Sequence, residues 1–275
     1  MVTVSIVTYK HNIEDIDRLL QVIKNSNIVS KIFIIDNSPS NDLQQQLKCY
    51  KCEYIFLNRN SGFGAGHNIA FEKAINQKVE YHFVINPDIF LESNVINNIV
   101  EFMDQNHEVG LLMPKILYPD GSIQYLPKLL PQPFDLLIRR LNILSKVFSK
   151  RLNNYELKQF SDSSSFEAPV ISGCFSCFRI DALPITGLYD ERFFMYFEDF
   201  DLSRRINKHF KTFYYSDVHV FHEYERGAQK SFALFKIYVI SAIKYFNKWG
   251  WFFDHERRIV NETALENLRI SKNEK

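Results

Sequence analysis

Short runs of apolar, β-prone residues alternate with helical patterns over the first 115 residues of the chain. Apolar residues recur at helical spacing after Asn12 and again after Ser93. The runs between them combine β-branched and aromatic residues and predict buried strands at 2–8, 31–36, 53–57, 81–85 and 109–114. This alternation predicts an α/β fold, with a mostly parallel central sheet flanked by helices.

Polar residues gather where four of the predicted strands end. They are Thr8 and Tyr9, Asp36 and Asn37, the segment 58–68, and Asn86 with Asp88. Each group alone is typical of a polar turn, because Asn, Asp, Ser and Gly satisfy their own backbone there. Ligands of open α/β sheets bind outside the carboxyl ends of the strands. Four such ends together therefore favour a nucleotide site at this edge.

The segment 58–68 carries a Gly-x-Gly-x-Gly pattern, which is neither the dinucleotide fingerprint nor a Walker loop. Its glycines are Gly62, Gly64 and Gly66. Glycines allow a backbone to approach a ligand closely, and Arg59 can offer charge to a diphosphate. Because a strand precedes it and a helical pattern over 69–75 follows, we expect this segment to be a ligand-binding loop.

Five carboxylates lie among six aromatic residues between Tyr189 and Leu202. Acids on an ordinary surface are spaced among polar residues, so acids within an aromatic wall indicate a cleft where a carboxylate does chemistry. The alternative is structural, since acids also favour the positive end of a helix that runs through Leu202. A second acid, Asp88, follows a predicted strand and is a candidate metal ligand. The two segments predict a two-part active site.

Composition narrows the class of protein. With 275 residues, 46% of them hydrophobic, the chain can bury a full core. Its formal net charge of +1 does not support a nucleic-acid footprint over the surface. No charged leader precedes the N-terminal apolar run, and no apolar stretch is long enough to span a membrane. We therefore expect a cytoplasmic protein that binds no nucleic acid.

Two segments combine an apolar stripe with basic residues. Residues 128–151 have six basic residues against one acid, a net charge of +5, and residues 231–251 repeat the pattern with three lysines. The stripe of the first segment consists of Leu136, Leu137, Leu141, Leu144 and Phe148. Such a stripe is typical of a helix on an anionic membrane, and equally of a helix packed on the domain with a solvated basic face. The sequence does not separate the two.

Four cysteines form two Cys-x-x-Cys pairs, Cys49 with Cys52 and Cys174 with Cys177. The spacing superficially indicates zinc. Residues 170–178, however, predict a buried strand, on which residues three apart point to opposite faces. We therefore expect reduced, packed thiols.

Six motifs follow one another in order along residues 2–225. They are Ser5-Ile6-Val7-Thr8-Tyr9, Ile35-Asp36-Asn37-Ser38, Asn60-x-Gly62-Phe63-Gly64-x-Gly66-x-Asn68, Asn86-Pro87-Asp88, Gly173-Cys174-Phe175, and Asp190-Glu191-Arg192-Phe193-Phe194 running into Glu198-Asp199-x-Asp201-Leu202. In this order they resemble the GT-A-fold inverting glycosyltransferases of the large second family, particularly the bacterial rhamnosyltransferase-like branch. The resemblance implies a GT-A domain over 1–225, with a basic amphipathic insertion at 128–160. Residues 226–275 are then a C-terminal helical extension that contacts membrane or acceptor.

The resemblance implies transfer of a sugar from a nucleotide-diphosphate donor to an acceptor hydroxyl, with inversion at the anomeric carbon. The rhamnosyltransferase-like form implies dTDP-L-rhamnose as donor and a lipid-linked oligosaccharide of a surface polysaccharide as acceptor, at the inner face of the membrane. UDP-galactose, UDP-glucose, UDP-N-acetylglucosamine and GDP-fucose remain open as donors, because fold-level likeness does not fix the substrate. Two rival hypotheses also remain, a two-carboxylate glycoside hydrolase and a non-catalytic binder of nucleotide sugar or carbohydrate.

Roles for single residues follow from the same resemblance. Asp36 would contact the nucleobase, and Thr8 and Tyr9 would line the nucleoside pocket. The further donor contacts would be Asn37, Arg59, Gly62, Gly64, Asn68 and Asn86. The family's Asp-x-Asp metal motif appears as Asn86-Pro87-Asp88, which leaves Asp88 as the carboxylate ligand of Mg²⁺ or Mn²⁺. His222 matches a position where related enzymes place a histidine near the metal or diphosphate, although a histidine that merely ends a strand is an equal alternative.

A carboxylate must accept the proton of the acceptor hydroxyl, because a sugar hydroxyl is a poor nucleophile near neutral pH. By resemblance this base is Asp199, whereas Glu198 and Asp201 position the acceptor or hold the start of a helix. Phe194 and Tyr196 are expected to shape the acceptor site, since sugar faces stack on aromatic rings. Core packing explains some of these rings equally well.

Overall fold

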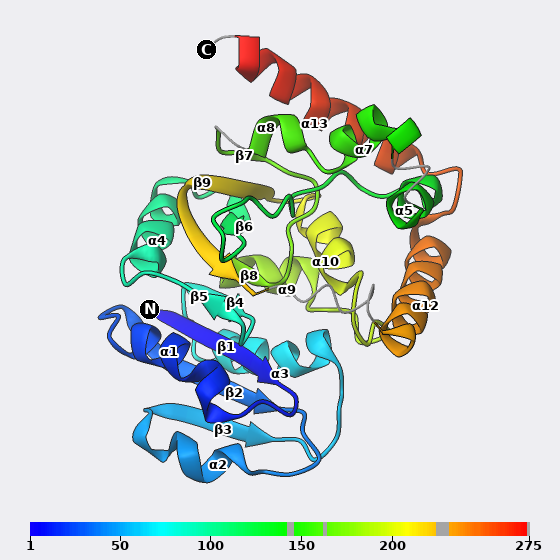
Figure 1. Ribbon diagram of the computed structural model, residues 1–275. Coiled ribbons are helices and arrows are strands. Elements are labelled where there is room, and N and C mark those ends of the chain that lie inside the picture. Colours follow the sequence, from blue (N-terminus) through cyan, green and yellow to red (C-terminus); the bar gives the residue numbers. More distant parts are fainter. Residues whose placement is uncertain (142–145, 162–163, 224–230, 274–275) are drawn as a thin grey trace.

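The computed structural model of the protein describes residues 1–141, 146–161, 164–223 and 231–273. Its strands are β1 (Val2–Thr8), β2 (Val29–Asp36), β3 (Cys52–Phe56), β4 (Tyr81–Ile85), β5 (Ile89–Phe90), β6 (Val109–Leu117), β7 (Phe166–Glu167), β8 (Phe175–Arg179) and β9 (Lys211–His222). They form one sheet in the order β3-β2-β1-β4-β8-β6-β9-β5, with β7 also paired to β9 (Figure 1). All five strands predicted in the first 115 residues are present.

Most strands of the sheet share one direction. Strands β3, β2, β1, β4, β6 and β9 run parallel, whereas β8, β5 and β7 run against them. The predicted α/β fold with a mostly parallel sheet is therefore confirmed. The antiparallel β8 lies at the centre, between β4 and β6.

Helices connect and cover these strands. They are α1 (Ile13–Lys24), α2 (Leu43–Gln46), α3 (Phe63–Asn76), α4 (Val95–Gln105), α5 (Pro133–Arg140), α7 (Ser149–Tyr155), α8 (Lys158–Ser161), α9 (Leu183–Thr186), α10 (Glu198–Ile206), α12 (Phe232–Trp249) and α13 (His255–Asn273), with 3₁₀ turns at Leu47–Cys49 and Ile180–Ala182. Asn12 caps α1, and its N–H donates to Oδ2 of Asp15 at 2.7 Å. At α4 the capping position is Asn94.

The predicted strand over residues 170–178 is only partly correct, because β8 begins at Phe175. Two backbone N–H groups before it donate to side chains of α10 instead of to a neighbouring strand. The N–H of Ile171 donates to Oγ of Ser203 at 3.1 Å, and that of Gly173 donates to Asp199 at 3.3 Å. These bonds satisfy the backbone outside the sheet.

The glycine segment is a loop only over residues 58–62, because α3 already begins at Phe63. Gly62 precedes the helix with φ of +90°, a conformation that favours glycine. A Cβ on Gly64 would lie 2.8 Å from Cβ of Tyr189, and one on Gly66 would lie 2.8 Å from Cγ2 of Val7. The glycines weaken helix propensity, which hid the helix start from the sequence pattern. Close packing of α3 on its neighbours is what requires them.

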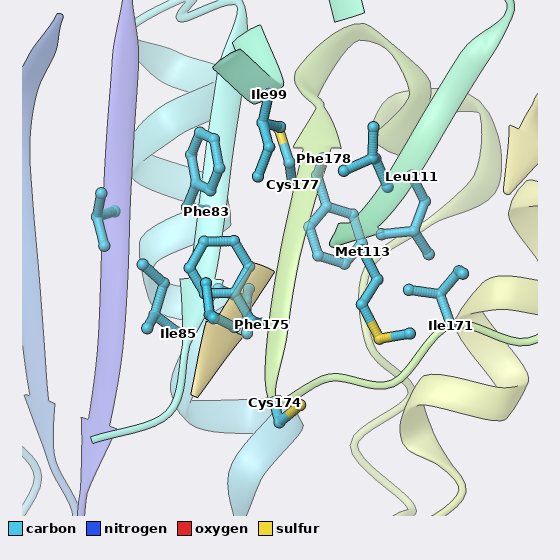
Figure 2. Close-up of a cluster of buried hydrophobic side chains, with 14 of the residues drawn as sticks. Phe83, Ile85, Ile99, Leu111, Met113, Ile171, Cys174, Phe175, Cys177 and Phe178 are labelled. Atoms are coloured by element: carbon cyan, nitrogen blue, oxygen red, sulfur yellow. The ribbon is translucent and has the colours of Figure 1, made fainter. Parts of the chain in front are cut away.

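One part of the main core lies between β4, β6, β8 and helix α4 (Figure 2). The rings of Phe83 and Phe175 meet edge to face with centroids 5.9 Å apart. Cys177 lies close to Ile99 on α4, and Cys174 lies at the other end of the cluster (Figure 2). All four cysteines are free.

The C-terminal helices α12 and α13 pack on separate parts of the sheet domain (Figure 1). Tyr245 and Phe246 of α12 form a buried cluster with Phe193 and Phe197. Leu268 of α13 joins the main core. The extension is helical as predicted, and the predicted boundary between residues 225 and 226 lies outside the described part of the chain.

The insertion forms the short helices α5, α7 and α8 rather than one amphipathic helix. Leu137 and Leu141 of the predicted stripe are 49% and 45% exposed, whereas Leu144 lies outside the described residues. Lys128, the first cation of the segment, is buried and contributes nothing to a basic surface. Among the described residues, no helix has both the length and the apolar character needed to cross a membrane.

Candidate functional site

A cavity of about 680 Å³ brings the two predicted acidic segments together. Its wall includes Asn86 and Asp88 from the turn between β4 and β5, Glu198 and Asp199 from the first turn of α10, and His222 from the end of β9. The pairing of β5 with β9 sets Ile89 opposite His222, which draws the Asp88 turn to this position. Residues far apart in the sequence thus share one cavity, as the two-part site predicts.

Asp88 and His222 form an ion pair at the inner end of the cavity. Nε2 of His222 lies 3.3 Å from Oδ2 of Asp88, and Nδ1 lies 3.1 Å from Oε1 of Gln124. Burial opposes a charged ring, but the neighbouring Cys174 and the Asp88 carboxylate together raise the pKa of His222 to about 10. The ring is therefore an imidazolium near neutral pH.

Asp88 offers one oxygen that fits a divalent cation. Its Oδ1 is buried and has no hydrogen-bond partner among the described residues. A hard cation such as Mg²⁺ prefers an oxygen of this kind and takes its other ligands from phosphates and water. Within the described ranges no three His, Cys, Asp or Glu side chains are grouped to hold an ion by themselves. His222 could add a nitrogen only after losing its proton.

Asp199 is held by backbone donors at the opening of α10. Its Oδ1 accepts from the N–H of Phe200 at 2.9 Å, and its Oδ2 accepts from Gly173. Burial raises the pKa of Asp199, and these donors and the charge of Lys128 only partly offset it. A carboxylate with a raised pKa is a stronger base than one in water, which suits proton abstraction from a hydroxyl.

Glu198 stands beside Asp199 as the more deeply buried acid. Its Oε2 has no partner among the described residues, and burial, with the charge of Asp199, raises the pKa of Glu198 well above its ordinary value. Two coupled acids seldom ionise together. The pair therefore favours a state in which the two carboxyl groups share one proton.

The backbone just before these acids is strained. Tyr196 and Phe197 both have φ of +68°, in the left-handed region that side-chain-bearing residues seldom adopt. Ring contacts hold Phe197 there, with centroids 5.3 Å from Tyr238 and 5.5 Å from Tyr245, both on α12. Residues of this kind cluster at functional sites. The sequence carries no local signal for this strain.

Two predicted acceptor residues lie outside the cavity wall. Asp201 is fully buried, and its Oδ1 accepts from Trp249 at 2.8 Å and pairs with Lys248 at 2.7 Å. These contacts anchor α12, which neither alternative predicted, and a contact of Asp201 with the acceptor stays a prediction. The other residue is Phe194, whose carbonyl oxygen accepts a hydrogen bond from the N–H of Phe63 at 2.9 Å. Tyr196 does line the cavity.

The residues predicted for the nucleoside lie together at the ends of β1 and β2, outside this cavity. Asp36 accepts from the N–H of Ser38 at 2.8 Å and from the hydroxyl of Tyr54 at 2.7 Å. Asn37 Nδ2 donates to the carbonyl of Gly62 at 3.1 Å, which ties this edge to the start of α3. The hydroxyl of Thr8 is buried and has no partner among the described residues.

The remaining predicted donor residues differ in exposure. Tyr9 and Arg59 are exposed, whereas the amide of Asn68 is buried against the backbone of Tyr189. Gly62 and Gly64 lie against Phe194 and Tyr189, so packing inside the protein accounts for them. Their contacts with a donor stay predictions.

Sequence reasoning missed Lys128, which lines the cavity although its position predicted a surface cation. Its Nζ donates to the carbonyl oxygens of Tyr125 and Leu126, at 3.3 and 2.9 Å. Burial is the main cause that lowers the pKa of Lys128 to about 7. The only available signal was the apolar pair Leu129 and Leu130 that follows it.

The sequence also gave no sign of the role of Tyr54. Its hydrogen bond to Asp36 becomes visible only through the pairing of β2 with β3.

The fold is similar to that of solved glycosyltransferase structures. GalNAc-T7 crystallised with UDP, GalNAc and Mn²⁺ gives a TM-score of 0.60 over 81% of this chain and 43% of that chain, at 15% identity. TarS of S. aureus gives 0.56 over 90% and 40%, at 15% identity. Residues 1–349 of TarS in complex with UDP give 0.54 over 90% and 65%, at 16% identity. The fold is therefore GT-A.

The model of glycosyl transferase family 2 matches residues 3–183. The chain belongs to glycosyl transferase family 2. It is 27% identical over 210 residues to the low-salt glycan biosynthesis hexosyltransferase Agl10 of Haloferax volcanii. The match covers 75% of this chain and 61% of Agl10, so the chain spans about three fifths of the length of this curated relative.

Proposed function

We propose that this protein is an inverting glycosyltransferase that moves L-rhamnose from dTDP-L-rhamnose to a hydroxyl of a lipid-linked glycan in surface polysaccharide synthesis. The observation that carries the proposal is the meeting of Asp88 and Asp199 in one cavity. Glycosyl transfer needs positive charge beside the leaving diphosphate, which a metal ion on Asp88 would supply, and a base for the acceptor hydroxyl. Membership of glycosyl transferase family 2 supports the reaction class.

In this proposal Asp199 accepts the proton of the acceptor hydroxyl as its oxygen bonds to the anomeric carbon. The diphosphate leaves from the opposite face of the sugar, so the configuration inverts. Asp88 would hold Mg²⁺ or Mn²⁺, with His222 as a further ligand in its neutral form, and the ion would offset the charge of the leaving diphosphate. Protonated Glu198 and the ring of Tyr196 would contact the acceptor.

The donor would lie along the edge from β1 to the Asp88 turn. Each oxygen of Asp36 accepts one bond within the protein and retains a lone pair for a base N–H. The partnerless hydroxyl of Thr8 is a ready contact for the nucleoside, and Tyr9 lies beside it. The other proposed contacts are Asn37, Arg59, Gly62, Gly64, Asn68 and Asn86. The alternative donor is a nucleotide carrying a different hexose. The hexosyltransferase Agl10, the relative named above, is compatible with rhamnose and with another hexose.

The lipid-linked acceptor would place the protein on the inner face of the membrane as a peripheral protein. Support comes from three exposed aromatic residues, Phe232, Phe252 and Phe253, which are 83%, 76% and 99% exposed. Lys236 and Lys244 on α12 supply positive charge for anionic lipids. Exposed apolar residues with cations nearby are typical of membrane-surface proteins.

A donor screen tests the function. Purified protein is given a panel of nucleotide sugars with Mg²⁺, with Mn²⁺ or with a chelator, and release of nucleoside diphosphate is followed with and without a lipid-linked acceptor mimic. We expect release from dTDP-L-rhamnose alone, dependent on both metal and acceptor. Release from another hexose donor would show that the transferred sugar is not rhamnose. Sugar release from a glycoside without nucleotide, or donor binding without turnover, would overturn the proposal.

A further inference from the structure

The cavity at Asp199 continues outward between α5 and α12, which lie next to each other at one edge of the molecule (Figure 1). The outer wall is apolar and comes from both helices. Its side chains are Leu136, Leu137, Phe235, Val239, Ala242 and Ile243. We call this part of the cavity the α5–α12 groove.

The α5–α12 groove is open to solvent at its mouth. Leu137 is 49% exposed, and Val239 and Ile243 are 37% and 41% exposed. A single exposed apolar residue is ordinary on a protein surface, but these three line one cavity together. Apolar residues gathered at a concave surface mark a ligand or interaction site.

Cations line the cavity next to both the acids and the apolar wall. Lys128, Arg139 and Arg140 all line the same cavity. The charges of Asp199 and Arg139 both act on Lys128, so Lys128 lies near both. The guanidinium of Arg140 stacks on Phe235 at 4.3 Å, which joins α5 to α12 at the groove. Arg139 also pairs with Glu156 at 3.1 Å.

From the inside outward, the cavity therefore presents a candidate base, then basic side chains, then an apolar trough. A ligand of matching order has a hydroxyl, then an anionic group, then a hydrocarbon chain. Apolar chains gain most from the trough because burial removes their surface from water. Arginine and lysine pair with phosphate oxygens.

We infer that the α5–α12 groove binds the hydrocarbon chain of an acceptor whose sugar is joined to that chain through phosphate. The chain then lies in the groove, the phosphate lies near Lys128 and Arg139, and the sugar hydroxyl reaches Asp199. This inference rests on the proposed function and deepens it, because it locates the lipid of the acceptor and adds a phosphate between lipid and sugar. In this inference one lipid molecule enters a cavity of the protein. Adsorption of the exposed aromatic residues to a membrane needs no such cavity.

Calorimetric titration of the full chain with dodecyl phosphate and butyl phosphate, both below micelle-forming concentrations, tests the inference. Each buried methylene strengthens binding about fourfold, so we expect dodecyl phosphate to bind at least about a hundredfold more tightly. Trp251 lines the same cavity, so dodecyl phosphate brominated on its chain should quench its fluorescence. The quenching should disappear in Trp251→Phe.

Matched variants locate the site. Ala242→Trp fills the groove and should weaken dodecyl phosphate binding at least about tenfold, as loss of two buried methylenes would. Ala233→Trp makes the same change at an exposed position of α12 outside the groove and should leave the affinity unchanged. Leu137→Gln is the second test, because this exposed position tolerates a polar residue. Wild-type affinity in both groove variants, or equal binding of the two phosphates, overturns the inference.

A separate measurement on the same proteins keeps the two proposals apart. Binding of dTDP and binding of dTDP-L-rhamnose, both measured without acceptor, depend on the donor edge and not on the groove. Loss of both in every protein would count against the proposed function. Intact donor binding with no preference for dodecyl phosphate would count against the groove alone.

Discussion

The side-chain amide of Asn68 pairs with the backbone of Tyr189 through two hydrogen bonds. Nδ2 donates to the carbonyl oxygen at 2.9 Å, and the Tyr189 N–H donates to Oδ1 at 3.0 Å. Nδ2 also lies 3.2 Å from Oε1 of Glu191. Asn68 belongs to α3, on the side predicted for the nucleotide, and Tyr189 opens the segment that leads to Asp199. This pair therefore joins the two halves of the candidate site.

Removal of the Asn68 amide should destabilise the protein strongly. Asn68→Ala leaves the N–H and carbonyl of Tyr189 buried without partners, so the free energy of unfolding should fall by about 2–4 kcal/mol. Asn41→Ala is the control, since the Asn41 amide bonds Gln44 on the surface, at 3.0 Å. Urea unfolding measures both variants. Equal losses would contradict the structural role of Asn68.

A methyl group on Gly66 should collide with Val7. The added Cβ would lie 2.8 Å from Cγ2 of Val7, in the strand under α3, so Gly66→Ala should cost about 1–3 kcal/mol of unfolding free energy. Val7→Ala removes the colliding atoms. In the double variant the cost of Gly66→Ala should therefore be smaller, which a double-mutant cycle by urea unfolding measures. Additive costs would show that packing on Val7 is not why residue 66 is glycine.

The loss of the carboxylate at position 199 should abolish most transfer while donor binding is kept. Asp199→Asn keeps the shape and removes the basicity, so the transfer rate should fall by about 10²–10⁴. In the wild type the rate should decline as the pH falls through the raised pKa of Asp199. Asp181→Asn makes the same change at an exposed position outside the cavity and should transfer normally. A wild-type rate in Asp199→Asn would remove this residue from catalysis.

The buried ammonium of Lys128 should make stability rise with pH. Burial lowers the pKa of Lys128 to about 7, from the ordinary value of 10.5 that it keeps in the unfolded chain. Between these values the unfolded chain binds more protons, so the free energy of unfolding should increase by at most about 1.4 kcal/mol per pH unit. Below about pH 7 this contribution is constant, because both states are then protonated.

Lys128→Met should reduce this slope, which urea unfolding between about pH 7 and pH 10 measures. The exposed Lys236→Met serves as control and should keep the slope of the wild type. Identical slopes in Lys128→Met and wild type would show that Lys128 is not buried as a neutral amine.

Local patterns predicted five strands of the first half of the chain with small errors, but they missed the start of α3 and the short elements α2 and β5. Val2–Thr8 and Tyr81–Ile85 were predicted to the residue, because each strand buries its own apolar run in the sheet. The helix after Asn12 was equally clear, since one face at helical spacing supplies its buried residues. The acids of the candidate site were also visible locally, because carboxylates among aromatic residues are unusual.

By itself, the sequence determined the α/β class, most element positions and the acidic segments, because burial on one face leaves a local period in the chain. Only the tertiary structure decided which of those acids meet. Asp88 reaches His222 through the pairing of β5 with β9, and Asp201 turns to α12 although it is only two residues from Asp199. The burial of Lys128 and the α5–α12 groove likewise arise from contacts between distant segments. Local periodicity carries no record of such contacts, because each depends on where another part of the chain packs.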